Sequence, residues 1–97
     1  MKRRAVTFTP LARNDLLGIG DWIAERAGVD VAFNYVARLE AYCQGFEFSG
    51  ERGRRRDDLS PGLRVVGFER RVAIVFAVFD DEVVILRLYY GRQNWSR

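Results

Sequence analysis

Apolar side chains recur with the period of an α-helix in two neighbouring stretches of the chain. In the first stretch, spacings of four, three, four and four residues place these side chains on one face: Ala12, Leu16, Ile19, Ile23 and Ala27. In the second stretch, spacings of four, three, four and three do the same for Ala32, Val36, Leu39, Cys43 and Phe46. Such spacing is typical of amphipathic helices that pack nearly antiparallel. The pattern therefore predicts two helices, each with one buried face.

Residues at the ends of these stretches mark where each helix starts and stops. Thr9 is a good N-cap, and Pro10 suits the first helical turn, where its missing N–H costs nothing. Gly28 is a typical helix terminator, and Asp30 can cap the second helix. Because only this short link separates the two helices, the sequence predicts a helical hairpin.

Segments rich in β-branched and aromatic residues predict four strands, at residues 5–8, 63–68, 71–79 and 82–90. Short polar breaks separate the last three, which predicts a meander covered on one face by the hairpin. Residues 49–62 are rich in glycine and charge, and they predict an exposed loop. The expected fold is α+β: an N-terminal strand, a two-helix antiparallel hairpin and a three-stranded antiparallel meander, in one domain spanning residues 1–97.

Composition indicates a globular protein and the compartment in which we expect it. Hydrophobic residues make up 48% of the 97 residues and charged residues 30%, a balance that is ordinary for a globular protein with one core. The single cysteine, Cys43, cannot form an internal disulfide, and the basic start lacks the apolar run of a signal peptide. The longest apolar run, residues 72–79, is far shorter than the roughly 20 residues of a membrane helix. We therefore expect a cytoplasmic protein without a membrane segment.

The residue types needed for common catalytic chemistry are missing. The chain has no histidine, and Lys2 is its only lysine. Zinc sites and Ser-His or Cys-His catalytic pairs are therefore excluded, and the glycines match neither a P-loop nor a dinucleotide fingerprint. The acidic run of residues 80–82 is interpreted as solvated charge at a turn, not as a cation site. We expect no metal, no cofactor and no catalytic residue set.

Two arginine features are candidates for binding. The run of residues 54–56 is the densest basic segment, and arginine suits phosphate or carboxylate, although a solvated loop explains the run as well. Arg87 interrupts an apolar strand, where a charge is costly unless it faces water or meets a partner. Two interpretations of Arg87 remain open: a structural ion pair at a sheet edge, or a residue that contacts another molecule.

Aromatic residues form the other candidate surfaces. Residues 89–95, Tyr-Tyr-Gly-Arg-Gln-Asn-Trp, combine three aromatics with an arginine, as binding hot spots do. The alternative is a strand end that folds these aromatics back onto the core. Trp22, Tyr35 and Tyr42 are expected on the rim of the helical stripes, where they could pack or contact a partner.

The order of these motifs resembles the ParE branch of the ParE and RelE toxins from bacterial toxin-antitoxin modules. The resemblance covers nearly the whole chain and rests on residues 8–16 with 19, 22 and 23, on residues 56–59 with 61–64, and on residues 85–92. Members of this family share a strand, a helical hairpin and an antiparallel sheet. The resemblance therefore implies the same architecture as the periodicity.

The resemblance also implies a function. It implies a toxin held inactive by a cognate antitoxin, usually of ParD type, whose C-terminal segment wraps the toxin. ParE-like members typically poison DNA gyrase, whereas RelE-like members cut messenger RNA on the ribosome with lysine-rich sites. Since Lys2 is the only lysine and arginine is a poor general base, we favour gyrase and a toxin that is not an enzyme. The alternatives are a RelE-like ribonuclease, with direct nucleic-acid binding left open, and a non-toxic member that only binds its antitoxin.

Two sets of contact residues follow as hypotheses. The target-binding set comprises Arg64, Arg87, Tyr89, Tyr90, Arg92 and Trp95. The antitoxin-binding set comprises Trp22, Tyr35 and Tyr42.

Overall fold

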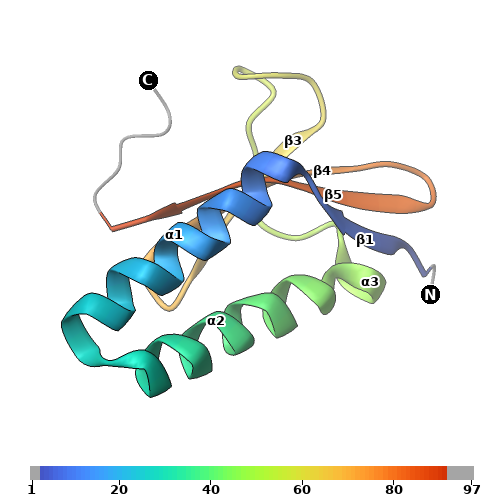
Figure 1. The fold of residues 1–97 in the computed structure, drawn as a ribbon. Helices are drawn as coiled ribbons and strands as arrows, with labels where there is room; N and C mark the ends of the chain where they lie inside the picture. The colour runs from blue at the N-terminus through green and yellow to red at the C-terminus, as the bar shows by residue number, and fades with distance from the viewer. Residues whose placement is uncertain (1–2, 92–97) are drawn as a thin grey trace.

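The computed structural model describes residues 3–91, which form two long helices packed on one face of a five-stranded sheet (Figure 1). The elements are, in chain order, β1 (Ala5–Phe8), α1 (Pro10–Ala27), α2 (Val29–Gln44), α3 (Phe46–Ser49), β2 (Arg54–Arg55), β3 (Leu63–Phe68), β4 (Val72–Val78) and β5 (Glu82–Tyr90). This arrangement confirms the α+β class and the helical hairpin.

The helix boundaries confirm most of the capping prediction. The Thr9 hydroxyl accepts the Ala12 N–H at 3.0 Å, and Pro10 opens α1. Gly28 ends α1 with a φ of 100°, and it is also the N-cap of α2. The prediction that Asp30 caps the second helix is wrong, because α2 begins one residue earlier, at Val29. Within residues 3–91, no helix is long and apolar enough to cross a membrane.

The sheet confirms the meander and extends it at both edges. The strand order is β1-β5-β4-β3-β2, with β3, β4 and β5 antiparallel as expected. The N-terminal strand β1 pairs in parallel with β5, so β5 is an internal strand over residues 82–85. The expected loop contains the two-residue edge strand β2 and follows the short helix α3. The turn from β3 to β4 has positive φ at both central residues, 50° at Glu69 and 60° at Arg70.

The core lies between the helices and the sheet, while no helix of residues 3–91 covers the opposite face of the sheet (Figure 1). Tyr35 belongs to this core, with 8% of its surface exposed, so its placement on the rim is corrected. The buried stripe of α2 runs through Ala32, Tyr35, Leu39 and Cys43, and Val36 is only half-buried. After Ala32, a spacing of three, to Tyr35, therefore fits the buried face better than the spacing of four, to Val36, that the sequence suggested.

Candidate functional site

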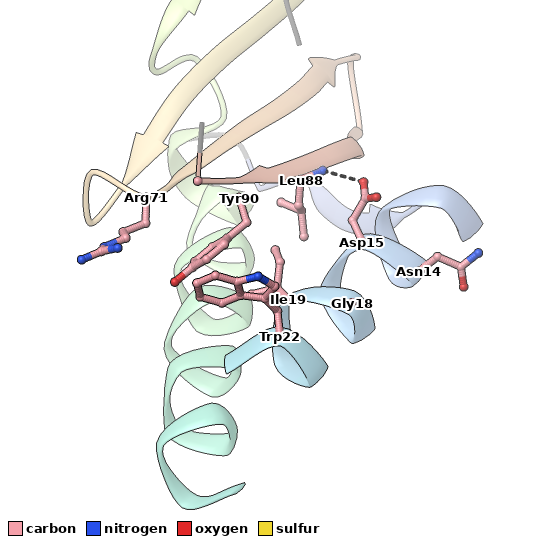
Figure 2. A pocket seen from close by; sticks show the side chains of 9 residues that line it. Asn14, Asp15, Gly18, Ile19, Trp22, Arg71, Leu88 and Tyr90 are labelled. Carbon is pink, nitrogen blue, oxygen red and sulfur yellow. Dashed lines mark hydrogen bonds between the residues drawn. The ribbon is translucent and has the colours of Figure 1, made fainter. Parts of the chain in front are cut away.

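A groove lies where α1 crosses the end of β5 (Figure 2). Its volume is about 630 Å³, and the residues that line it come from α1, the turn before β4, β5 and the residue after it: Asn14, Asp15, Gly18, Ile19, Trp22, Arg71, Leu88, Tyr90 and Gly91. The groove exists because β1 pairs with β5 only as far as Ile85. Beyond that residue the chain of β1 has turned into α1, so no strand among residues 3–91 pairs with the last part of β5 on this side.

Two aromatic rings form one wall of the groove. The ring centroids of Trp22 and Tyr90 are 5.1 Å apart, and Figure 2 shows the two side chains lying against each other. Tyr90 also meets Tyr35 edge to face at 6.0 Å, so the core supports this wall. The outer side of Trp22, which is 43% exposed, is covered in part by the Arg26 guanidinium, 3.9 Å from the ring centroid. The wall therefore joins a residue of the expected antitoxin set to a residue of the expected target set.

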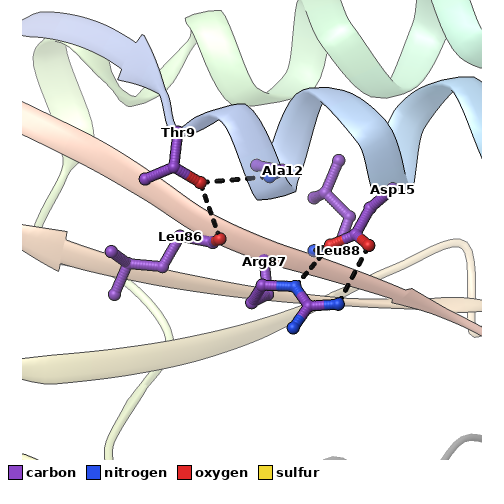
Figure 3. A network of polar contacts seen from close by, with 6 residues as sticks. All are labelled: Thr9, Ala12, Asp15, Leu86, Arg87 and Leu88. Atoms are coloured by element: carbon purple, nitrogen blue, oxygen red, sulfur yellow. Dashed lines mark hydrogen bonds and ion pairs between the residues drawn. The ribbon is translucent and has the colours of Figure 1, made fainter.

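Side chains of α1 and of its N-cap bond to β5 where β1 no longer pairs with it (Figure 3). The Thr9 hydroxyl donates to the Leu86 carbonyl at 2.9 Å. The Asp15 carboxylate accepts the Leu88 N–H at 2.9 Å and two bonds from the Arg87 guanidinium at 2.8 and 3.1 Å. These bonds fix the start of α1 against the strand that carries the groove.

The Asp15 contact confirms the first of the two interpretations of Arg87, the structural ion pair, and leaves a contact with another molecule as a prediction. The side chains of Asp15 and Arg87 are 16% and 35% exposed, so the ion pair is half-buried. An arginine side chain is always charged in proteins, and the hydrogen bonds to Asp15 raise the pKa of Arg87 above its ordinary value. The structural ion pair is therefore present, at the flank of β5 that β1 does not reach. Arg87 also lies 4.8 Å above the ring of Tyr89.

The remaining candidate residues are dispersed. Tyr42 is half-buried between Phe46 and Phe68, with centroids at 5.6 and 5.2 Å. Arg64 lies on β3 and reaches the Arg52 carbonyl at 3.4 Å, beside a separate hollow of about 290 Å³. Strand alternation places Tyr89 on the opposite face of β5 from Tyr90. The two C-terminal candidates, which lie outside the described residues, are Arg92 and Trp95.

Several groove residues had no role in the sequence analysis. Asp15 and Arg71 are the main examples: Asp15 lies within residues 8–16, which carry the family resemblance, but neither residue was singled out as a candidate. A signal for Asp15 existed: it is four residues before Ile19 and seven before Trp22, which puts the three on one side of a helix. Its partner Arg87 is 72 positions away, and no local pattern connects the two.

Comparisons with known proteins agree with the fold. Residues 6–95 match the family described as the ParE toxin of the type II toxin-antitoxin system parDE. Toxin ParE3 of Caulobacter vibrioides is 33% identical over 72 residues, which cover 74% of this chain and 71% of that protein.

Two solved structures share the fold. One, from the chromosomal ParDE system of P. aeruginosa, has a TM-score of 0.80 at 24% identity, covering 93% of this chain and 98% of that one. The other, from the RelBE2 toxin-antitoxin complex of Mycobacterium tuberculosis, has a TM-score of 0.67 at 20% identity, covering 96% and 97%. The family match spans nearly every described element, including both sides of the groove. This chain belongs to the ParE toxin family of type II toxin-antitoxin systems.

Proposed function

We propose that this toxin inhibits DNA gyrase in the cytoplasm and is neutralised by a ParD-type antitoxin. The observation that carries the proposal is the family match over residues 6–95. The similarity to a toxin named ParE3 and to a structure from a ParDE system supports a ParD-type partner. The side chains beside the groove favour a toxin that binds its target over one that cleaves RNA.

The groups beside the groove are poorly suited to cleaving RNA. The charge of Arg87 is held by Asp15, and an arginine with a raised pKa does not act as a general base. The ring of Tyr90 packs between Trp22 and Tyr35. The sequence contains no histidine that could move a proton in their place. These features support a toxin that acts by contact with its target.

We assign the target contact to the open face of the sheet and the C-terminal end. Arg87 and Tyr89 meet there as a stacked cation and ring, a combination frequent in binding hot spots. Arg92 and Trp95 follow this strand in sequence and belong to the same proposal. Tyr90 lines the groove and Arg64 lines the separate hollow beside β3, so we expect both to contribute less to the target contact.

We assign the antitoxin contact to the groove and the outer surface of the helices. Large apolar side chains are exposed there, including Trp22 and Phe33, the latter with 72% of its surface exposed. An amphipathic helix laid along such a surface would cover them and exclude water. Tyr42 can extend this contact at the rim, whereas Tyr35 supports the wall from the core.

Induced expression in cells separates the two modes of toxicity. Inhibition of gyrase is expected to induce the DNA damage response while messenger RNAs stay intact, and co-expression of a ParD-type antitoxin is expected to restore growth. Messenger RNA cleaved on ribosomes, with normal DNA supercoiling, would show that the chain acts as a ribonuclease. Unimpaired growth at full expression would identify a member without toxicity.

A further inference from the structure

The outer edge of β3 is open where β2 stops. β2 pairs only with Arg64 and Val65. The Leu63 carbonyl accepts the Arg56 N–H at 2.8 Å, so Leu63 directs its backbone groups toward this edge. Since the direction alternates along a strand, Val65 and Gly67 direct theirs to the same edge. Within residues 3–91, no strand pairs with Gly67 on that side.

Two glycines lie near this open edge: Gly53, directly before β2, and Gly67, within β3. β2 begins at a sharp turn at Gly53, where φ is 78° and a Cβ would lie 2.5 Å from the Val65 carbonyl oxygen. At Gly67 the backbone is ordinary, and a Cβ would meet only the Val72 carbonyl oxygen at 3.9 Å. The fold therefore does not require glycine at position 67. A glycine inside a strand weakens it, and often marks a place where another backbone approaches closely.

Arginines surround this open edge. Arg54 lines a hollow of about 220 Å³ on one side of Gly67, and Arg70 and Arg71 line another of about 290 Å³. All three arginines are exposed, and none forms an ion pair within the described part of the chain. Glu69, the acidic residue at the hairpin tip, is held by two bonds of 3.0 Å from Arg38. The edge therefore carries uncompensated positive charge.

We propose that the edge of β3 at Gly67 binds an extended, acidic segment of a partner protein, which continues the line of β2 by β-strand addition. The partner's backbone pairs with the N–H and C=O groups of Gly67, and its carboxylates reach Arg54, Arg70 and Arg71. The unpaired backbone groups favour a peptide over a nucleic acid, because a phosphate backbone supplies no matching N–H donors. This site adjoins the groove, with which it shares Arg71, and it does not depend on the target of the toxin.

Peptide binding to the full chain tests the proposal directly. The probe is a short fluorescein-labelled peptide of alternating glutamate and valine, measured by fluorescence anisotropy, with a lysine-valine peptide and oligothymidylate as comparisons. We expect the acidic peptide alone to bind, with affinity that falls as salt rises. In the same complex, hydrogen exchange of the Gly67 amide should slow. Stronger binding of oligothymidylate, no binding of the acidic peptide, or unchanged exchange at Gly67 would overturn the proposal.

Matched variants separate the charge from the backbone contribution. The double substitution Arg70→Glu and Arg71→Glu should weaken peptide binding about tenfold, whereas Arg3→Glu, at the N-terminus, should not change it. Gly67→Pro removes the backbone N–H at the open edge, which β4 does not use, and should weaken peptide binding about tenfold as well. Gly67→Ala keeps this N–H and should bind the peptide like the native chain. Circular dichroism verifies that each variant folds. Native affinity in the charge-reversed variant contradicts the proposal even if Gly67→Pro fails to fold.

Discussion

Replacing Asp15 with alanine removes the acceptor of three hydrogen bonds that join α1 to β5. Two come from Arg87, at 2.8 and 3.1 Å, and one from the Leu88 N–H, at 2.9 Å. Hydrogen bonds to charged groups contribute about 1.5–3 kcal/mol each. The side chain of Arg87 is 35% exposed, so solvent screening lowers the share of the ion pair. We expect Asp15→Ala to lower the free energy of unfolding by about 3 kcal/mol.

Three comparison variants identify the source of this loss. Arg87→Ala leaves the bond between Asp15 and the Leu88 N–H in place, and Asp15→Asn keeps an oxygen that can accept it. Each should cost less than Asp15→Ala, about 1–2 kcal/mol. Asn14→Ala changes an exposed neighbour on the same helix, and it should stay within about 0.5 kcal/mol of the native chain.

Urea unfolding followed by far-ultraviolet circular dichroism measures these differences, provided that the denaturant slope is the same for all variants. If Asp15→Ala is as stable as Asn14→Ala, the bonds from Asp15 to β5 do not stabilise the fold. If Arg87→Ala costs as much as Asp15→Ala, the ion pair carries the whole effect and the Leu88 bond contributes nothing.

Other predictions concern the core and the hairpin turn. The hydroxyl of Tyr35 is buried without a hydrogen-bond partner among residues 3–91, so Tyr35→Phe should raise the free energy of unfolding by about 1 kcal/mol in urea titrations; a loss would contradict this. Burial raises the pKa of Tyr35 from 10.0 to about 12 and that of Cys43 from 9.0 to about 12. Between about pH 9 and 12, these two groups therefore keep their protons in the folded chain but lose them in the unfolded chain, so the free energy of unfolding should fall as pH rises from about 9 to 12. The fall should be less steep in Tyr35→Phe, and urea midpoints that stay constant over this range would contradict the prediction. Arg70→Gly relieves a φ of 60°, so it should raise the free energy of unfolding by about 0.5–1 kcal/mol and with it the thermal midpoint. Arg71→Gly, at ordinary φ, should lower the thermal midpoint. Equal changes in the two variants would exclude backbone strain as the cause.

The sequence predicted the features that arise from neighbouring residues. The helical period, the Thr9 cap and the Gly28 terminus are local, and the structure confirms all three. The assignment of Tyr35 to the rim failed because spacings of three and four both fit a helical period. One residue of helical rotation, about 100°, is enough to move a side chain from the surface into the core.

The groove could not be predicted in the same way, because it depends on contacts between distant segments. The parallel pairing of β1 with β5 joins the two ends of the described chain, and nothing in either segment specifies that partner. The contact between Trp22 and Tyr90 and the bond from Arg87 to Asp15 follow from this pairing. Composition and strand patterns identified several of these residues as candidates, but only the fold shows which of them meet.

The supercoiling of relaxed plasmid DNA by purified gyrase, titrated with the purified chain, tests the central claim most directly. The account predicts that supercoiling is lost as toxin is added and is restored when a cognate ParD-type antitoxin is bound first. Full supercoiling activity in the presence of an excess of folded toxin would contradict inhibition of gyrase.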